Sequence, residues 1–462
     1  MTDARPATRW WGLEAVDAAA PDTVWAFGRE PIDYARLRRE IQRIGTLLDE
    51  NGIGAGHVVS LRIPNSFTLL WWLFALWSRG AQVLLLDPRM KPAESEAVVT
   101  LVRPGFHVHS ATAPNPLTGF IDECDATLER TSERRAADPE IALLQCSSGS
   151  TGVPKIVART WRSLLADVDR HAANPGMATR SERVLLLSPP THAFGLAAGV
   201  LHGLRVGTTL VLPDLLLPDA LARRARDADV HAVLGVPAHF DLLSRSPGTA
   251  RVRSLRLALC CGEMLGASVR ERFRLRFGVP IGQGYGMSEV GAVATDLVGE
   301  LAPPAVGRVL PGVEIRIRDG ELYLRTERSP YPFDDRLDRY ADGWLRTFDR
   351  AEFDPRTGVL SLLGRSDSVR VIGGLKVDLS EIEAVLREHP AVSDAVAALR
   401  PGPDPLIEAH IATISPVRPD ELTGWCATRL SGFKVPRRWH IAEDLPRTAS
   451  GKADRAEIRA LT

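Results

Sequence analysis

A run of small and hydroxyl residues ends in a lysine at QCSSGSTGVPKIV, which begins at Gln145. Successive small residues expose backbone N–H groups, and together with serine and threonine hydroxyls these groups can surround phosphate oxygens. The run lacks the GxxxxGK[ST] form, because Pro154 precedes Lys155 and Ile156 follows it. The pattern therefore predicts a phosphate-binding loop that is not a mononucleotide P-loop, and a turn without a ligand is the alternative.

Two later segments offer the other groups that a nucleotide needs. In GQGYGMSEVG, the ring of Tyr285 can stack on a purine, Ser288 can donate to a phosphate, and Glu289 can hold Mg²⁺ through oxygen. In GWLRTFDRAEF and GRSDSVRVIGG, the carboxylate of Asp349 can accept ribose hydroxyls and Arg365 can bridge ribose and phosphate. The residue types predict a nucleotide site built from several distant segments.

Lysine is rare in this chain, since only five of its 57 basic residues are lysines. A chain that favours arginine should keep lysine where a compact ammonium on a flexible stem is needed. Lys155 lies in the loop above, and Lys452 lies in a second polar turn, LPRTASGKADR. Both are candidates for contact with phosphate, and chance placement is the alternative.

In chain order, from RGAQVLLLDPRMKPAE to LPRTASGKADR, these motifs resemble those of the adenylate-forming superfamily. That superfamily includes acyl- and aryl-CoA synthetases, nonribosomal-peptide adenylation domains and firefly-type luciferases. The resemblance implies ATP- and Mg²⁺-dependent conversion of a carboxylic acid to an acyl-AMP with release of pyrophosphate. Transfer to a thiol of CoA, or of the phosphopantetheine arm of an acyl carrier protein, would follow. An amine acceptor, a non-catalytic nucleotide-binding protein and an ADP-forming ligase or kinase are the alternatives.

The resemblance also implies a role for individual residues. It gives Lys452 as the catalytic lysine, Ser288 as the α-phosphate hydroxyl and Glu289 as both a catalytic residue and the metal ligand. It implies nucleotide binding by Ser147, Ser148, Gly149, Ser150, Thr151, Gly152, Lys155, Gly262, Glu263, Met264, Tyr285, Gly286, Asp349 and Arg365. Asp367 falls at the hinge, and Gly374 and Lys376 fall in an acceptor channel, although GGLKV also fits a strand with a glycine bulge.

The acyl group is expected beside His192, Phe194 and Gly284, with His239 as a further candidate that could equally be a core residue. Gly195 stands where amino-acid-activating relatives usually have aspartate, so an α-amino acid is disfavoured. Ala193 follows His192 where hydroxybenzoate-activating relatives commonly have asparagine, which also puts a salicylate-type substrate in doubt. An aryl or other acyl acid is therefore expected.

The elements that must position these residues follow from periodicity. Strand-like apolar runs at 58–63, 81–86, 183–188, 208–213, 231–237 and 256–261 alternate with helix-like segments such as 67–79, and such alternation predicts parallel sheets covered by helices. From about residue 305 the pattern becomes β-rich, and IRIRDGELYL predicts a hairpin. We expect a large α/β domain with a β-rich subdomain (1–366) and a small, mobile α+β domain (367–462) ending in a polar tail.

Composition excludes several classes of protein. The 462 residues are 45% apolar and 25% charged, which is typical of a folded chain, and the zero formal net charge argues against a nucleic-acid partner. The apolar run LLWWLFALW is too short to cross a membrane, and no secretory leader precedes it. The five cysteines lack CxxC spacing, and the histidines show no HExxH pair and no cluster at metal-ligand spacing. A cytoplasmic enzyme with a small-molecule acid as its partner is expected.

Overall fold

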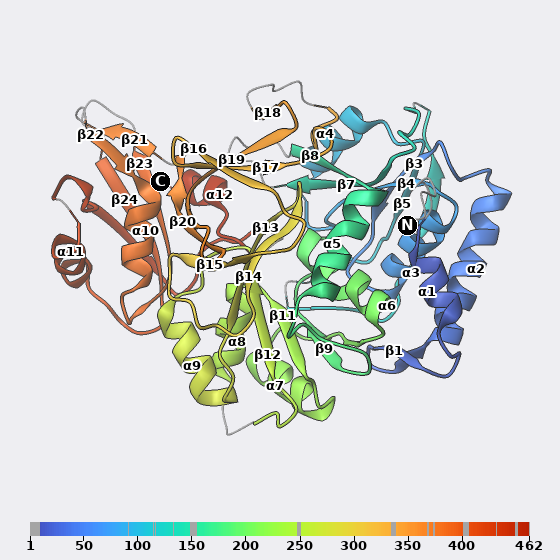
Figure 1. Ribbon diagram of the computed structural model, residues 1–462, viewed down its shortest axis with the longest axis horizontal. Helices are drawn as coiled ribbons and strands as arrows, with labels where there is room; N and C mark the ends of the chain where they lie inside the picture. Colours follow the sequence, from blue (N-terminus) through green and yellow to red (C-terminus); the bar gives the residue numbers. More distant parts are fainter. Residues whose placement is uncertain are drawn as a thin grey trace.

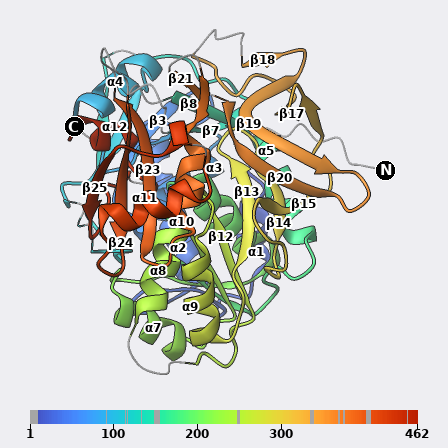
Figure 2. The same ribbon diagram turned by 90° about the vertical axis from the view of Figure 1, so that its left-hand side faces the viewer.

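The computed structural model contains a large N-terminal body and a smaller C-terminal unit, drawn in orange to red in Figure 1. Figure 2 faces that C-terminal unit. The structure describes residues 10–90, 92–113, 115, 117–132, 134–147, 155–246, 251–333, 339–366, 369–372, 375–400, 406–430, 432–448 and 451–461.

A six-stranded sheet forms one part of the N-terminal body. Its inner strands are parallel, while β6 and β8 pair antiparallel at the two edges. In spatial order the strands are β6 (Thr127–Arg130), β5 (Phe106–His109), β3 (Val58–Arg62), β4 (Gln82–Leu85), β7 (Ile141–Ser147) and β8 (Lys155–Thr160). Helices α1 (Gly12–Ala18), α2 (Tyr34–Glu50), α3 (Phe67–Ser78) and α4 (Pro92–Val102) belong to this half of the body.

Helix α3 is the apolar segment whose length argued against a membrane span. Residues 67–77 of this helix are all buried, and Trp71, Phe74 and Trp77 belong to the main hydrophobic core. Ser66 begins the helix as its N-cap, because its hydroxyl accepts a hydrogen bond from the N–H of Leu69 at 3.1 Å. Within the described part of the chain, no helix combines the length and apolarity that a membrane crossing requires.

The second sheet has 14 strands and changes character along its length. Its first part is mainly parallel: β13 (Gly282–Met287), β12 (Leu257–Cys261), β11 (Ala232–Gly235), β9 (Arg183–Leu186), β10 (Thr209–Val211) and β1 (Val24–Phe27), with β2 (Pro31–Asp33) antiparallel at the edge. Helices α5 (Trp161–Ala173), α6 (His202–Val206), α7 (Pro218–Asp227), α8 (Pro237–Arg245) and α9 (Ala267–Phe277), with the π-helix η1 (Gly195–Leu201), accompany this part. The strand and helix alternation predicted from sequence is confirmed here.

The same sheet continues as an antiparallel, β-rich part. Its strands are β14 (Gly291–Asp296), β15 (Ala305–Val309), β20 (Val359–Arg365), β19 (Trp344–Asp354), β17 (Glu321–Arg325) and β16 (Ile315–Arg318), and β18 (Tyr340–Ala341) pairs with β19. The predicted hairpin at IRIRDGELYL is confirmed, since β16 and β17 pair antiparallel and both turn residues, Asp319 and Gly320, have positive φ.

The C-terminal unit contains the hairpin β21 (Val369–Ile372) and β22 (Leu375–Asp378) and a three-stranded sheet. That sheet orders β23 (Val392–Arg400), β24 (Leu406–Thr413) and β25 (Arg438–Ala442), with α10 (Leu379–Arg387), α11 (Pro419–Ala427), η3 (Gly432–Lys434) and α12 (Arg455–Ala460) around it. The expected polar tail was wrong in part, because it contains β25 and α12. The pairing of β25 with β24 and the burial of Ile458 hold these two elements in the unit.

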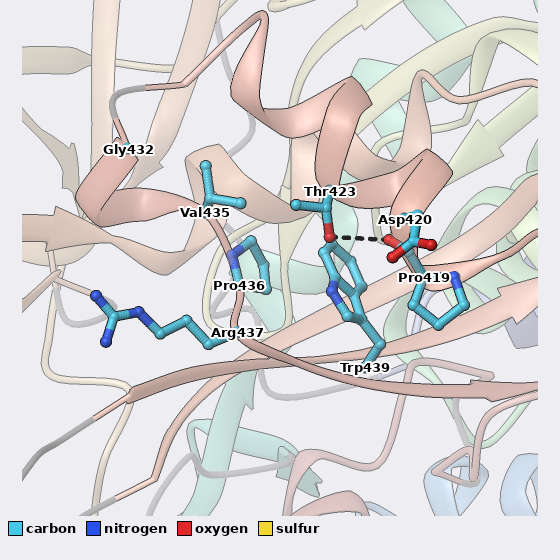
Figure 3. A pocket seen from close by; sticks show the side chains of 8 residues that line it. All are labelled: Pro419, Asp420, Thr423, Gly432, Val435, Pro436, Arg437 and Trp439. Carbon is cyan, nitrogen blue, oxygen red and sulfur yellow. Dashed lines mark hydrogen bonds between the residues drawn. The ribbon is translucent and has the colours of Figure 1, made fainter.

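A shallow groove of about 420 Å³ lies on the α11 side of this unit (Figure 3). Trp439 of β25 lines it together with Pro419 and Thr423 of α11. Thr423 Oγ1 donates to the carbonyl oxygen of Pro419 at 2.8 Å within α11.

Candidate functional site

Tyr285, Asp349 and Arg365 come together although they lie far apart in sequence. Strand β13 carries Tyr285, and the adjacent strands β19 and β20 carry Asp349 and Arg365 as a directly paired couple. Tyr285 Oη donates to Asp349 Oδ2 at 2.5 Å, and Arg365 Nη1 donates to Asp349 Oδ1 at 3.1 Å. Burial, and then the neighbouring carboxylate of Asp349, raise the pKa of Tyr285 well above its usual value. The phenol is therefore a hydrogen-bond donor at neutral pH.

Asp349 is held by its own strand as well as by these two partners. Its backbone N–H donates to Thr347 Oγ1 at 3.0 Å, and Thr347 is fully buried. The intervening Phe348 has φ of 65°, in the left-handed region that favours glycine. Two guanidinium groups cover its ring, with Arg346 at 4.5 Å and Arg339 at 5.1 Å from the centroid. This local geometry projects the carboxylate toward Tyr285.

Ser288 and Glu289 occupy the turn between β13 and β14. Tyr331 Oη donates to Glu289 Oε1 at 2.6 Å, and both side chains are buried. Burial, and then Glu289, raise the pKa of Tyr331, so its hydroxyl keeps its proton. A carboxylate oxygen beside a serine hydroxyl is a donor set that suits a hard cation such as Mg²⁺.

A buried charge network beneath this turn was missed by the sequence analysis. Arg159 of β8 and Asp167 of α5 are each 1% exposed, and their Nη2 and Oδ2 atoms lie 3.3 Å apart. Arg159 Nη1 donates to the carbonyl oxygen of Ser288 at 3.3 Å, and Asp167 Oδ1 accepts from the N–H of Ala292 at 2.9 Å. Arg170 Nη2 adds a bond to the carbonyl oxygen of Val290 at 2.9 Å. The network therefore fixes the backbone on both sides of Glu289.

Asp167 remains a carboxylate in this setting. Burial opposes its ionisation, but Arg159, His171 and Arg170 hold the pKa of Asp167 below its usual range. Its position could have been noticed in sequence, because Asp167 falls on the same helical face as Trp161 and Leu164, the face that α5 buries. A charged residue on an apolar face predicts a buried partner.

The segment predicted to lie beside the adenine follows strand β12. Gly262 has φ of 104°, which favours glycine, and the carbonyl oxygen of Glu263 accepts from Gln283 Nε2 at 3.1 Å. Met264 and Tyr285 pack against the same hydrophobic cluster, so the structure brings these two predicted residues together. Gly286 of the neighbouring strand is exposed and approaches the backbone of Gly291.

Lys452 lies beside this segment, although it belongs to the C-terminal unit. Its Cε would be 3.8 Å from a Cβ atom built on Gly262. Burial and Asp394 raise the pKa of Glu263, whereas Arg387, Lys452 and Arg447 lower it, so Glu263 faces the C-terminal unit. The backbone oxygen of Lys452 accepts from the N–H of Thr448 at 2.7 Å within its own turn.

His192 and Phe194 precede the π-helix η1, and Thr191 accepts a 2.8 Å bond from Gln145 Nε2 through its carbonyl oxygen. His192 Nε2 lies 3.6 Å from Asp87 Oδ2, and Arg89 Nη2 donates to the same oxygen at 3.0 Å. Burial would raise the pKa of Asp87, but the nearby His192 and the hydrogen bonds from Arg89 lower it well below its usual value. The sequence analysis gave no role to this Asp87 and Arg89 pair.

Glycines at the predicted acyl site allow neighbouring atoms to pack closely. A Cβ on Gly195 would lie 2.2 Å from the carbonyl oxygen of Pro189, and a Cβ on Gly284 would lie 2.3 Å from Cys261 Sγ. His239 is buried, and its Nδ1 accepts from the N–H of Val236 at 3.3 Å. Burial, followed by Arg89, Arg447 and His192, lowers the pKa of His239 to about 4. The histidine is thus neutral at physiological pH.

Several predicted residues have less structural description. Ser147 and Lys155 pair across β7 and β8 at the two ends of the predicted phosphate loop. Lys376 lies on β22, where only its backbone is described. Ser148, Gly149, Ser150, Thr151, Gly152, Asp367 and Gly374 lie outside the described residues.

Comparison with known proteins covers both parts of the chain. A family model described as AMP-binding enzyme matches residues 13–327, and one described as AMP-binding enzyme C-terminal domain matches residues 381–452. The chain is 27% identical over 490 residues to the p-hydroxybenzoic acid–AMP ligase FadD22 of Mycobacterium tuberculosis, covering 96% of this chain and 67% of that protein. It is 27% identical over 492 residues to a feruloyl-CoA synthase of Amycolatopsis sp., and the match covers 97% of this chain and 98% of that protein.

The fold is also similar to that of the o-succinylbenzoate coenzyme A synthetase of Bacillus subtilis in complex with AMP. The TM-score is 0.81 at 22% identity, covering 97% of this chain and 98% of that chain. The fold and the two family models thus agree on the kind of protein to which this chain is similar. The chain belongs to the AMP-binding enzyme family and combines that family's large domain and its C-terminal domain in one polypeptide.

Proposed function

We propose that this enzyme activates an aromatic carboxylic acid with ATP and transfers the acyl group to the thiol of CoA. In the first step a carboxylate oxygen bonds to the α-phosphorus of ATP, and the bond from that phosphorus to the bridging oxygen breaks to release pyrophosphate. In the second step the sulfur of CoA bonds to the acyl carbon. The carbon–oxygen bond to AMP then breaks, and the thiol proton leaves to solvent.

The observation that carries this proposal is the hydrogen bond between Tyr285 and Asp349, with Lys452 approaching the nearby Gly262 from a third part of the chain. Tyr285 offers a ring face, and Asp349 offers acceptor oxygens already ordered by hydrogen bonds of 2.5 and 3.1 Å. Lys452 Cε lies near Gly262, which follows the strand beside Tyr285. An aromatic face, a carboxylate and a nearby ammonium suit the adenine, ribose and α-phosphate of one nucleotide.

Charge explains why Lys452 is assigned to the first step. A carboxylate and a triphosphate repel each other, and the transition state gathers negative charge around the α-phosphorus. Donors aimed at such developing charge supply large rate effects because they need little reorganisation. Bound Mg²⁺ would neutralise phosphate charge, Glu289 would hold it, and Ser288 would donate to the α-phosphate. We assign Lys452 the task of neutralising the attacking carboxylate and the α-phosphate together.

A movement of the C-terminal unit would separate the two steps. Lys452 lies in a turn of that unit, whereas Tyr285, Glu289 and Asp349 belong to the large sheet. The ordered strand β20 ends at Arg365, and the separate hairpin begins at Val369, which is consistent with a hinge at Asp367 and with domains at 1–366 and 367–462. Withdrawal of Lys452 after adenylation would let Gly374 and Lys376 line the path of the thiol.

The preference for an aryl acid rests on the acyl side of the site. Gly195 can carry no side chain without displacing Pro189, so position 195 offers no carboxylate for an amino group. His192 and Phe194 present flat rings, which suit contact with an aromatic acid. The relatives named for p-hydroxybenzoic acid and for feruloyl-CoA act on aromatic acids, which supports the same class here. The five free cysteines fit a reducing compartment such as the cytoplasm.

The test is product analysis with a panel of acids. The purified enzyme is incubated with ATP, Mg²⁺ and benzoate, 4-hydroxybenzoate, ferulate, medium-chain fatty acids or amino acids, with and without CoA. We expect AMP and pyrophosphate with an aromatic acid, and an aryl-CoA thioester when CoA is present. ADP and phosphate as products would contradict adenylation. Adenylate without thioester would point instead to a carrier-protein thiol or an amine acceptor.

A further inference from the structure

Three side chains in the C-terminal unit converge on one face of its sheet. Glu408 and His410 alternate along β24, so both project to the same side, and His440 on β25 is the direct register partner of His410. The neighbouring Trp439 lines the groove on the α11 side (Figure 3), which places His440 on the opposite face. One donor atom from each of the three side chains lies within 4.8 Å of the other two, and no other such group of three occurs among the described residues.

The donor atoms face one another without satisfying one another. His440 Nε2 lies 3.6 Å from Glu408 Oε2, and His410 Nε2 lies 3.9 Å from Glu408 Oε1, both too long for hydrogen bonds. Glu408 Oε2, His410 Nε2 and His440 Nε2 are all buried atoms without a hydrogen-bond partner. The side chains of Glu408 and His410 are only 3% and 5% exposed. Buried polar groups are normally paired, so this cluster lacks a partner.

We propose that Glu408, His410 and His440 bind one divalent transition-metal ion of the zinc type. Imidazole nitrogen favours Zn²⁺ and similar ions, whereas Mg²⁺ and Ca²⁺ prefer oxygen alone. Two donors that each lie about 2.1 Å from zinc can be at most ~4.2 Å apart, and the two measured nitrogen–oxygen separations fall within that limit.

The imidazole rings need a small adjustment to bind. The rings of His410 and His440 stack with centroids 4.4 Å apart and an angle of 8° between their planes. Parallel rings do not direct both lone pairs at one point, so one ring must rotate. His440, whose side chain is 36% exposed, has the freedom to do so. Solvent on that side could also supply the remaining ligand.

A metal ion at this position would stabilise the packing of the C-terminal unit. Val396, the register partner of His410, and Ala412, two residues beyond it, pack with Leu445 and Ile458. A metal bridge between β24 and β25 would therefore fasten the edge strand beside the core that holds the end of the chain. Strand β25 ends at Ala442, ten residues before Lys452, so the ion would also anchor the segment that carries this lysine.

The test measures metal alone and does not depend on adenylation. The full-length protein is stripped with a chelator and dialysed, and Zn²⁺ is then added without nucleotide. Equilibrium dialysis with elemental analysis should give one zinc per chain, and Co²⁺ should give visible absorption typical of nitrogen and oxygen ligands. His440→Gln and, independently, Glu408→Gln should each lower zinc affinity by about 100-fold, the upper part of the range for losing support at a metal site.

His389→Gln is the matched control, because His389 lies in the same unit outside the cluster and contacts Trp425. It should retain one zinc with unchanged affinity. Absence of zinc binding by the wild-type protein would overturn the proposal. So would equal zinc binding by the wild type and both cluster variants, with circular dichroism confirming that the variants are folded.

Discussion

The two sides of the proposed nucleotide site are built in opposite ways. Tyr285, Asp349 and Glu289 lie on or between strands of one large sheet, and side chains from other strands or loops hold each of them. Lys452 lies in a short turn whose bonds from Thr448 and Arg447 are local to the C-terminal unit. Toward the large body, its stem approaches Gly262 and its charge lowers the pKa of Glu263.

This difference teaches how one site can serve two successive reactions. Groups that bind the nucleotide throughout should be rigid, since preorganised donors cost little reorganisation. A group needed for only one step can be carried on an element that moves. On this proposal, the fixed side takes its rigidity from buried contacts, whereas the side that carries Lys452 would move between the two steps.

The largest effect should come from breaking the buried pair under Glu289. Arg159→Met would remove the nearest cation from the buried carboxylate of Asp167 and leave Arg170 at 3.5 Å as its remaining arginine partner. Removal of one partner of a buried pair typically costs about 3–5 kcal/mol. We expect this loss in the free energy of unfolding, measured by urea denaturation, together with a higher Mg²⁺ requirement for pyrophosphate release.

Arg162→Met is the matched control for that change. Arg162 lies three residues further along the chain, and its ion pair with Glu327 at 3.1 Å is exposed on both sides. Exposed pairs contribute about 0–1 kcal/mol, so this variant should behave as the wild type. Equal effects of the two substitutions would show that the buried pair does not support the fixed side.

On the mobile side, Lys452→Ala should lower the rate of adenylate formation by about a hundred- to a thousandfold, or ~3–4 kcal/mol. Transfer of the acyl group from a supplied aryl-AMP to CoA should remain near the wild-type rate, because the lysine has withdrawn by then. Pyrophosphate release and thioester formation measure the two steps separately. A similar loss in both steps would argue against a group used only once.

The junction of the two sides predicts a dependence on pH. His239 is neutral in the folded protein because its pKa is lowered to about 4, whereas the unfolded chain takes up a proton near pH 6.5. Its contribution to stability is therefore full above pH 6.5 and is lost as the pH falls toward 4. Between pH 7 and pH 5 the wild type should lose about 2 kcal/mol more than His239→Asn, whose amide oxygen can replace Nδ1 as acceptor. The free energy of unfolding of both proteins is measured by urea denaturation at the two pH values, and an equal change for the two would refute this.

The smallest effect concerns the backbone that aims Asp349. Phe348 adopts φ of 65°, a conformation that costs a residue with a Cβ atom about 1–2 kcal/mol. Phe348→Gly should therefore be more stable than Phe348→Ala by about 1 kcal/mol, since both lack the ring that Arg339 and Arg346 cover. Calorimetry of the two variants tests this, and a more stable alanine variant would be inconsistent with left-handed strain.

The sequence predicted most of the fixed side because its motifs are local. The turn that holds Ser288 and Glu289 is contained in ten residues, and the hairpin at Asp319 and Gly320 depends on two turn residues. The contacts that join distant strands were not predicted from the sequence. Arg159 reaches Ser288 across 129 positions, and no spacing rule connects them.

The C-terminal unit was harder to predict because its tail is short of apolar residues. No position of strand β25 is fully buried, and its residues lack the apolar run that indicates a strand. Helix α12 buries Ile458 with few other apolar residues. The histidine cluster was missed because its members are distant in sequence. His410 and His440 are separated by thirty positions and meet because β24 and β25 pair in parallel.

The most direct test of the central claim is lysine-selective acylation of the enzyme, followed by peptide mass spectrometry. The chain has only five lysines, and Lys434 serves as an internal control because it pairs with Glu381 at 2.6 Å within the C-terminal unit. We expect ATP with Mg²⁺ to slow the labelling of Lys452 about tenfold, equivalent to ~1.4 kcal/mol of contact, without affecting Lys434. Unchanged labelling of Lys452 in the presence of nucleotide would contradict its entry into the site.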